Sequence, residues 1–362
     1  MQDLKFKTIA TNNKARAGEF TINNKIVRTP TFMPVATRGA VKGITMDTLS
    51  KIDPDVILCN AYHLISRPGT DVIANQGGIH NYINWEKVIL TDSGGFQGWS
   101  LGAKRLTEGL LIKSIYDGTE LLLTPELAIS AQIELGSDIA MILDDLIDPH
   151  SSEVDLKEAI DRTLLWSESS LNLHSNKKQS LFGIIQGGVS DRYREYSLYR
   201  TNQLNFDGYA IGGLSIGETA LDRNRVVELC SDSLPKNKPI YVMGLGDIFG
   251  MLDLIELGVD MFDCVWPTRL ARHGKIIDNV DFINLKNRKY ENDNLPLVEN
   301  CSCVTCNNYS RSYLRHLLIN EEVSSWPYLI EHNLYQTKNI LDNAREAIIL
   351  GSFRDYRESL NK

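Results

Sequence analysis

Eight short apolar runs recur along this chain, and segments of helical length separate most of them. The runs occupy residues 31–35, 56–60, 88–94, 139–145, 181–186, 208–213, 240–244 and 261–265. Continuous apolar runs that alternate with helices are typical of a parallel sheet buried on both faces. A doubly wound open sheet would alternate in the same way, but the count of eight favours an α/β fold of the (β/α)8 TIM barrel type, with its chemistry at the carboxyl ends of the strands.

Two segments interrupt this regular pattern. Residues 109–124 alternate in polarity on both sides of Asp117-Gly118, a pair that forms tight turns, so they predict a β-hairpin inserted in a barrel loop. After residue 265 the chain becomes polar, then carries three crowded cysteines and an amphipathic pattern over residues 334–360. We therefore expect a catalytic barrel over residues 1–290 and, packed on it, a zinc-binding subdomain with a C-terminal helix over residues 291–362.

The composition is that of a globular chain. With 362 residues, 43% apolar and 23% charged, it excludes a disordered, collagen-like or coiled-coil protein. The net charge of −8 argues against a uniformly basic, nucleic-acid-binding surface. No apolar run reaches the roughly 18 residues of a membrane span, and the first residues lack the apolar core of a signal peptide. We expect a cytoplasmic protein with no membrane contact.

The crowded cysteines predict a metal site. Cys301, Cys303 and Cys306 lie within six positions, and zinc takes four soft or borderline ligands in a tetrahedron. His316 and His332 are the histidines that follow. His316 lies on the polar side of an expected helix, which suits solvent, whereas His332 follows an apolar stretch that could fold back over the cysteines. Three unligated thiols are the less favoured interpretation, and four protein ligands would make one zinc ion structural.

Carboxylates end three of the apolar runs. Asp92, Asp144 and Asp263 follow different runs, and in a barrel they would converge at one mouth. Each alone is about as well explained by capping a helix, but together they supply a nucleophile, an acid or base and an acceptor for N–H donors, which glycosyl transfer requires. Gln186 offers an amide for a planar polar ligand, and the Gly212-Gly213 pair lets the backbone face it.

A basic segment follows Asp263. Residues 265–290 carry a net charge of +4 despite the acidic total. The charge alone would be explained by a solvated surface, but its position beside a reactive carboxylate indicates phosphates on either side of a reacting sugar. The bases are Arg269, Arg272, Lys275, Lys286, Arg288 and Lys289.

These residues together closely resemble one family, the tRNA-guanine transglycosylases of bacterial type. The matching motifs are Thr-Asp-Ser-Gly-Gly-Phe-Gln at 91–97, Gly-Ile-Ile-Gln-Gly-Gly at 183–188, Gly-Tyr-Ala-Ile-Gly-Gly-Leu at 208–214, Phe-Asp-Cys-Val-Trp-Pro-Thr-Arg at 262–269, and the cysteines with Glu-His-Asn at 331–333. They span nearly the whole chain in the family's order. The resemblance implies a pentosyltransferase of queuosine biosynthesis that replaces the wobble guanine of tRNA by a 7-deazaguanine base.

The resemblance also implies roles for individual residues. Asp263 would be the nucleophile that attacks the ribose anomeric carbon and expels guanine, and Asp92 would be the general acid/base. Double displacement gives net retention and ping-pong kinetics. The base would be bound by Asp144, Gln186, Gly213, the ring-sandwiching pair Phe96 and Met243, and the Leu214 carbonyl with Glu218 behind it. Arg269 and Arg272 would bind the anticodon loop, and Cys301, Cys303, Cys306 and His332 would hold one structural zinc ion.

Some positions depart from the family pattern. Asp145 and Leu146 stand where Glu-Cys is usual, and Ser215 and Ile216 line the expected pocket. Because Ile216 is bulky, we expect a small 7-substituent, as in 7-aminomethyl-7-deazaguanine, inserted into the GUN-anticodon tRNAs for aspartate, asparagine, histidine and tyrosine. The alternatives are a queuine-inserting salvage enzyme, a non-catalytic tRNA-binding subunit and a carbohydrate glycosidase. The family implies a homodimer.

Overall fold

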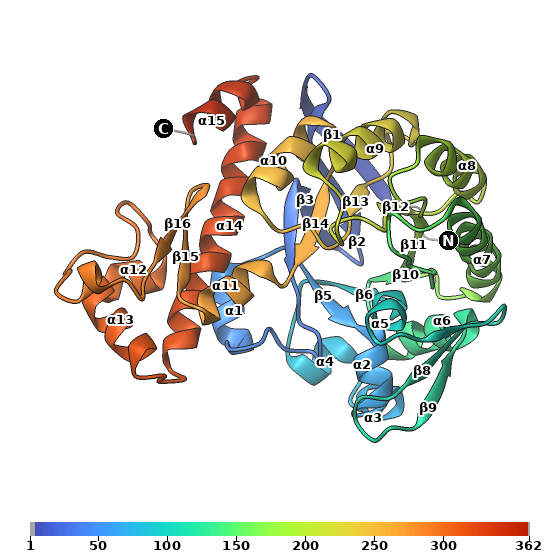
Figure 1. Ribbon diagram of the computed structural model, residues 1–362, viewed down its shortest axis with the longest axis horizontal. Helices are drawn as coiled ribbons and strands as arrows, with labels where there is room; N and C mark the ends of the chain where they lie inside the picture. Colours follow the sequence, from blue (N-terminus) through green and yellow to red (C-terminus); the bar gives the residue numbers. More distant parts are fainter. Residues whose placement is uncertain (1–3, 361–362) are drawn as a thin grey trace.

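An eight-stranded parallel barrel forms the centre of the computed structural model, which describes residues 4–360 (Figure 1). The strands run in the order β4-β14-β13-β12-β11-β10-β6-β5, and a parallel bridge between Val35 and Leu58 joins β4 to β5, closing the barrel. All eight apolar runs are therefore confirmed as strands, and the closed barrel excludes the open sheet. The strands are β4 (Thr31–Pro34), β5 (Val56–Asn60), β6 (Val88–Asp92), β10 (Ile139–Met141), β11 (Ser180–Ile185), β12 (Gly208–Ile211), β13 (Ile240–Val242) and β14 (Met261–Cys264).

The strands are apolar because they are enclosed on both faces. Met33, Phe182 and Phe262 are fully buried, and every residue of β11 is buried. Helices lie in the segments that connect the strands, and the longer ones surround the barrel (Figure 1). These helices are α1 (Met46–Ile52), α2 (Ala61–Ser66), α3 (Thr70–Asn75), α4 (Ile79–Ile83), α5 (Gly95–Ser100), α6 (Pro125–Leu135), α7 (Glu153–Leu173), α8 (Asp191–Asn202), α9 (Ala220–Ser233), α10 (Ile248–Glu256) and α11 (Trp266–Arg272).

The predicted hairpin is confirmed, and it is part of a three-stranded sheet. Strands β8 (Leu110–Lys113) and β9 (Glu120–Leu123) pair in antiparallel fashion, and Gly118 takes the positive φ of +77° that the turn requires. Strand β7 (Lys104–Arg105), which the sequence did not predict, adds to β8. The sheet lies between β6 and α6, at the carboxyl end of the barrel where the candidate active site is expected.

An antiparallel sheet precedes the barrel and was also not predicted. Its strands are β1 (Lys5–Asn12), β2 (Ala15–Ile22) and β3 (Lys25–Thr29). Arg16 of β2 makes a buried ion pair with Asp260, and Asp260 also accepts a hydrogen bond from the Ile240 amide at 2.7 Å. This pair fixes the sheet to the amino ends of β13 and β14, opposite the carboxyl ends where the candidate active site is expected.

The C-terminal region packs on the barrel through one long helix. Helix α14 contacts β15 and α11 and, further along, β1, β2 and β4 (Figure 1). The amphipathic pattern predicted over residues 334–360 falls within α14 and α15. The domain boundary at residue 290 stays a prediction. The elements here are β15 (Lys275–Asp278), β16 (Asp281–Asn284), the 3-10 helix η1 (Arg288–Tyr290), α12 (Val304–Asn308), α13 (Arg311–Ile319), α14 (Ser325–Ile349) and α15 (Phe353–Ser359).

Within residues 4–360, every helix is too short or too polar to span a bilayer.

Candidate active site and metal centre

Asp92 ends β6 and lies among hydrogen-bond donors from the neighbouring strand. The Asn60 amide donates to its Oδ2 at 2.5 Å, and the Ala61 backbone N–H donates to its Oδ1 at 3.1 Å. Burial raises the pKa of Asp92 to about 7, although these two bonds favour the charged form, and the nearby Asp263 and Asp144 raise it further. A carboxyl group with this pKa can both donate and accept a proton near neutral pH.

Asp263 ends β14, and only one of its two carboxylate oxygens accepts hydrogen bonds in the described chain. The Tyr241 hydroxyl and the Gly244 amide both donate to Oδ1, at 2.5 and 2.8 Å. Among residues 4–360, no group donates a hydrogen bond to Oδ2. Burial raises the pKa of Asp263, and the two donors oppose this effect. The arrangement orients the carboxylate through one oxygen and leaves the other available to attack an electrophile. The sequence reasoning missed Tyr241, because a tyrosine inside an apolar run resembles a core residue.

Asp144 and Gln186 meet on the far side of the barrel mouth. Asp144 follows β10, and its Oδ2 accepts a hydrogen bond of 2.6 Å from the Gln186 side-chain amide. Burial raises the pKa of Asp144 to about 7, and the adjacent Asp145 charge acts in the same direction. Gly95 makes this position possible, since a Cβ there would lie 2.1 Å from Asp144 Oδ1. The pair presents a carboxyl and an amide to a planar ligand.

Gly213 and a buried arginine lie close to the Gln186 side chain and its backbone. A Cβ on Gly213, where φ is +68°, would lie 2.4 Å from Gln186 Oε1. Arg194 is fully buried, and it donates to the carbonyls of Ile185 and Gly188, each at 2.8 Å. Its Nη2 has no hydrogen-bond partner among the residues described, and burial lowers the pKa of its guanidinium. Arg194 thus fixes the backbone on both sides of Gln186, a role that the sequence did not reveal.

Glu218 fixes the peptide that follows Leu214. Its two oxygens accept hydrogen bonds from the Ser215 and Ile216 amides, at 2.6 and 3.1 Å. The Ser215 amide belongs to the same peptide as the Leu214 carbonyl, and the two groups of a trans peptide point in opposite directions. The Leu214 carbonyl therefore points away from Glu218 and is available to a ligand donor.

Phe96 and Met243 come from opposite sides of the mouth. Phe96 is in α5, after β6, and is 50% exposed, whereas Met243 follows β13 and is half-buried. Three strands separate β6 from β13 in the barrel. A flat ring bound over the barrel mouth could therefore be contacted from both sides.

Asp145, one of the departures from the family pattern, is held by two arginines. Arg105 of β7 donates to its Oδ1 at 2.8 Å, and Arg162 of α7 donates to its Oδ2 at 2.7 Å. Arg105 also donates to the Leu146 carbonyl at 3.1 Å. Asp145 therefore anchors the inserted sheet to the barrel.

The basic stripe begins on α11, directly after Asp263. Arg269 is exposed, and Arg272 is half-buried with an unpartnered Nη1. Burial, and then the charge of Arg269, lower the pKa of Arg272. Of the six bases, only Arg288 has a carboxylate within 4.0 Å in the described chain, its partner being Glu291 at 3.3 Å. The remaining positive charges are free to bind an anionic ligand.

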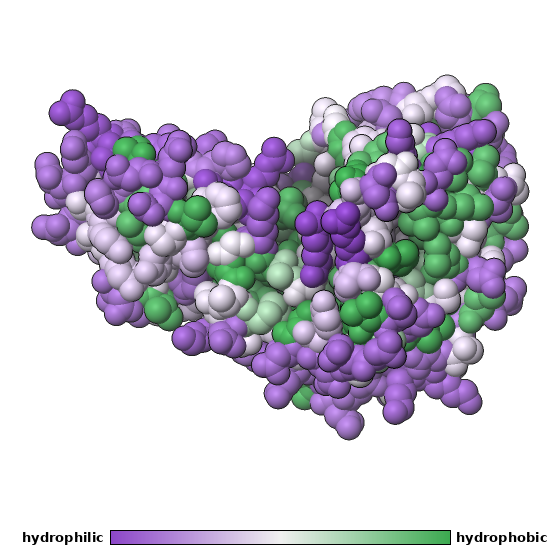
Figure 2. All heavy atoms as spheres, turned by 90° about the horizontal axis from the view of Figure 1, so that it is seen from below, coloured by the Kyte–Doolittle hydropathy of each residue, from purple (hydrophilic) through white to green (hydrophobic). Residues whose placement is uncertain are grey.

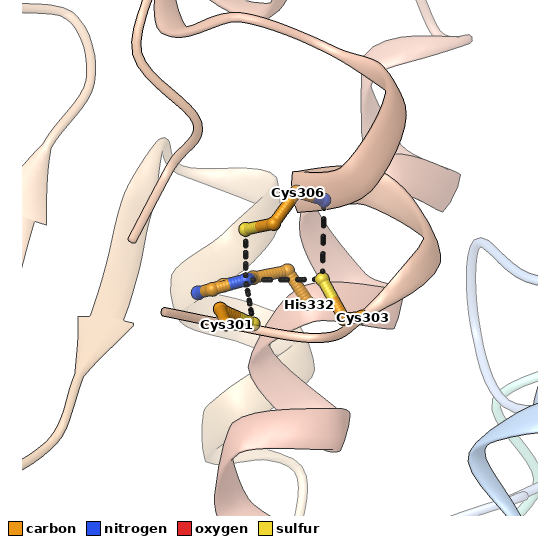
Figure 3. Close-up of side chains that lie close together, drawn as sticks. All are labelled: Cys301, Cys303, Cys306 and His332. Atoms are coloured by element: carbon orange, nitrogen blue, oxygen red, sulfur yellow. Dashed lines mark hydrogen bonds between the residues drawn. The ribbon is translucent and has the colours of Figure 1, made fainter. Parts of the chain in front are cut away.

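The predicted metal ligands form one cluster (Figure 3). The ligand atoms of Cys301, Cys303, Cys306 and His332 all lie within 4.8 Å of one another, and the three sulfurs lie 3.6, 3.4 and 3.3 Å from His332 Nδ1. Tetrahedral zinc with its usual bond lengths separates sulfur from nitrogen by about 3.6 Å, so the four residues fit zinc. His316 is exposed on α13, outside the cluster.

Neighbouring groups orient these ligands. His332 Nε2 lies 2.9 Å from the Ile277 carbonyl, which fixes the proton on Nε2 and leaves Nδ1 free for a metal. Glu331 accepts from the amides of Val304 and Thr305, at 3.2 and 3.1 Å. Asn333 donates to the Pro267 carbonyl at 3.0 Å, at the start of α11. Asn333, next to the ligand His332, thus ties the metal cluster to the helix that carries Arg269 and Arg272.

Comparisons with known proteins identify the family of this chain. A family model described as queuine tRNA-ribosyltransferase matches residues 11–362. The queuine tRNA-ribosyltransferase of Idiomarina loihiensis is 41% identical over 355 residues, covering 98% of this chain and 95% of the relative. That of Francisella tularensis subsp. novicida is 40% identical over 360 residues, covering 99% and 98%. The chain belongs to the queuine tRNA-ribosyltransferase family.

Proposed function

We propose that this protein exchanges the wobble guanine of GUN-anticodon tRNAs for 7-aminomethyl-7-deazaguanine, by double displacement. The observation that supports this most directly is that two carboxylates at one barrel mouth have different environments. Asp263 has a free oxygen and is oriented through the other, whereas Asp92 has a pKa of about 7. Glycosyl exchange with retention needs a nucleophile and a separate acid/base.

In the first displacement, Asp263 Oδ2 attacks C1′ of the ribose. The C1′–N9 bond breaks, its electron pair goes to guanine, and protonated Asp92 supplies the proton that the departing base takes up. A glycosyl ester with Asp263 results. In the second displacement, ionised Asp92 removes a proton from N9 of the incoming base, this nitrogen attacks C1′, and the ester bond breaks to release the Asp263 carboxylate. Guanine must leave before the new base binds, so the kinetics are ping-pong.

The base would be recognised by residues on the side of the barrel mouth opposite Asp263. Asp144 would accept from the N–H edge, while the Gln186 amide and the Gly213 N–H would bind the carbonyl oxygen. Phe96 and Met243 would hold the ring between them. These roles are supported by the hydrogen bond from Gln186 to Asp144 and by the close approach of Gly213 to the Gln186 amide.

The 7-substituent would face the segment that Glu218 fixes. A protonated aminomethyl group would donate to the Leu214 carbonyl, with the Glu218 carboxylate behind that peptide supplying negative charge. The half-buried Ile216 favours this small group over the cyclopentenyl group of queuine. Insertion of queuine remains the second candidate, and it shares every catalytic residue.

Arg269 and Arg272 would bind the anticodon loop, and one zinc ion held by the cysteine-histidine cluster would stabilise α11 without taking part in the chemistry.

A non-catalytic tRNA-binding subunit is disfavoured because both Asp92 and Asp263 are present with distinct environments. A homodimer and a cytoplasmic location complete the proposal and rest on the family resemblance alone.

The test is incorporation of radiolabelled guanine into an unmodified tRNA transcript that carries a wobble guanine. We expect label in precipitated tRNA for the wild type, and a covalent tRNA adduct on denaturing gels that Asp263→Ala abolishes. Competition between 7-aminomethyl-7-deazaguanine and queuine then separates the two candidate bases. Absence of incorporation by a folded, zinc-loaded protein would contradict the proposal.

A further inference from the structure

Two arginines and a histidine gather around one tyrosine at the tip of the inserted hairpin. The guanidinium carbons of Arg38 and Arg67 lie 5.2 and 4.7 Å from the centre of the Tyr116 ring. The Tyr116 hydroxyl lies 2.9 Å from His63 Nδ1, and Arg67 donates to the Tyr116 carbonyl at 3.4 Å. Three separate segments therefore converge, and we call Arg38, His63, Arg67 and Tyr116 the Tyr116 cluster.

The cluster concentrates positive charge that no ion pair within residues 4–360 neutralises. Both arginines are exposed, and within residues 4–360 neither has a carboxylate within 4.0 Å. The Thr119 amide and hydroxyl both donate hydrogen bonds to Asp117 Oδ1, and with the charge of Arg67 they lower the pKa of Asp117. In the described chain this carboxylate lies beyond ion-pair distance of both arginines. Two like charges on one ring repel each other, so the arrangement is favourable only with an anion bound or with strong solvation. Exposed arginines that an aromatic ring holds in place are typical of phosphate- and base-binding surfaces.

The cluster borders the candidate active site. Strands β14, β4, β5 and β6 are neighbours in the barrel, with Asp263 ending the first and Asp92 the last. Arg38 belongs to the loop after β4, His63 to α2 after β5, and Tyr116 to the insertion after β6. The cluster thus lies on the arc of the mouth between the two carboxylates.

Hydrogen bonds link this arc directly to Asp92. The Asn60 backbone N–H donates to the Thr37 carbonyl, next to Arg38, at 3.2 Å. The Asn60 side chain accepts from the His63 amide at 3.0 Å and donates to Asp92. Both halves of the cluster are therefore tied to the residue that holds the proposed acid/base.

We infer that the Tyr116 cluster binds the phosphate backbone of the tRNA anticodon loop, on the side of the reacting nucleotide away from Arg272. This inference rests on the proposed function, which supplies tRNA as the ligand. Positive charge then continues from α11 along the rim to the hairpin, and Tyr116 provides a ring on which a base can stack. Figure 2 shows the molecule from the side of α2–α4 and the hairpin, with a hollow between the C-terminal region and the barrel that both hydrophilic and hydrophobic side chains border.

The experiment compares the full-length double variant Arg38→Ala/Arg67→Ala with a charge-matched control. The control, Lys177→Ala/Lys178→Ala, also removes two positive charges. These two exposed lysines precede β11, at the opposite end of the barrel. Binding of an unmodified anticodon stem-loop RNA is measured by fluorescence anisotropy over a range of salt concentrations. Loss of two single-strand phosphate contacts should reduce the slope of log K against log salt by about 1.4 and weaken binding about tenfold at 0.15 M salt. The control should match the wild type.

Further variants separate recognition from structure. Tyr116→Ala should weaken RNA binding, whereas Tyr116→Phe, which keeps the ring, should bind nearly as the wild type does. The KM for guanine should stay within about twofold in the arginine variant. Unchanged RNA affinity and an unchanged salt slope in the double variant would overturn the inference. A sedimentation coefficient that shows misfolding or altered assembly of the double variant, sufficient to explain the loss of RNA binding, would also overturn it. Because binding is measured without turnover, an inactive wild type that binds RNA would refute the proposed function and leave this comparison valid.

Discussion

The hydrogen bond from Asn60 to Asp92 should set the pH dependence of base exchange. The Asn60 amide donates to Asp92 Oδ2 at 2.5 Å, and this bond favours the charged carboxylate. The same side chain accepts from the His63 amide and caps α2. Asn60→Ser is the most informative change, because a serine oxygen can still cap the helix but cannot reproduce the amide donor.

The size of the effect follows from the strength of that bond. A hydrogen bond to a charged group contributes about 1.5–3 kcal/mol, and one pKa unit corresponds to about 1.4 kcal/mol. Losing it should therefore raise the pKa of Asp92 by about 1–2 units, from the present value of about 7. The second displacement needs ionised Asp92 as a base, so the rising limb of activity against pH should move to higher pH by the same amount.

The assay is the pH dependence of kcat/KM for guanine, measured with radiolabelled guanine and saturating tRNA. The wild type should show a rising limb near pH 7, and Asn60→Ser should show it about 1–2 units higher with an unchanged thermal melting curve. Asp92→Asn should remove the limb along with activity. A limb that stays in place, or moves to lower pH, would refute the assignment of Asp92 as the base.

Four further predictions concern the pocket, the backbone behind it and the metal. Gly95→Ala should raise the KM for guanine about tenfold with little effect on tRNA binding, because the new Cβ would lie 2.1 Å from Asp144 Oδ1, and competition kinetics would detect it. Arg194→Met should lower the free energy of unfolding by about 1–3 kcal/mol in denaturant titrations and weaken base binding, since two buried carbonyls lose a donor. Asp92→Asn should raise the melting temperature more at pH 8 than at pH 5, because the folded pKa of about 7 exceeds the unfolded value, so stability declines until pH passes 7. Cys303→Ser should lower zinc content and melting temperature together, and full activity loss without loss of stability would contradict a structural metal.

Much of the fold could be predicted because its signals are local. A strand buried on both faces is apolar along its whole length, so eight runs marked eight strands, and Asp117-Gly118 marked the hairpin turn. The cysteine spacing likewise lies within one loop. The sheet over residues 5–29 escaped prediction because its attachment depends on Arg16 meeting Asp260, which lies 244 positions away. Nothing in either segment alone indicates that pairing.

The candidate site was likewise predictable only where its signals are local in the sequence. Carboxylates after apolar runs were visible as a pattern, but the groups that differentiate them were not. Tyr241 lies inside a strand and resembles a core residue, Asn60 ends its strand as an ordinary helix cap would, and Arg194 lies in a helix among other charged residues. Their functions appear only when neighbouring strands bring a hydroxyl or an amide to a particular oxygen, which is a property of the closed barrel.

The three aspartates show why residue type alone does not assign a role here. Asp263 receives both donors, Tyr241 among them, on one oxygen, so the other is free to form a bond. Asp92 has a donor on each oxygen and can exchange a proton but is poorly placed to act as nucleophile. Asp144 shares one oxygen with the Gln186 amide, which aligns two polar groups along one edge. Moving the Tyr241 hydroxyl away, as in Tyr241→Phe, should therefore slow formation of the covalent adduct more than it weakens binding of guanine, because only the nucleophile loses its orientation.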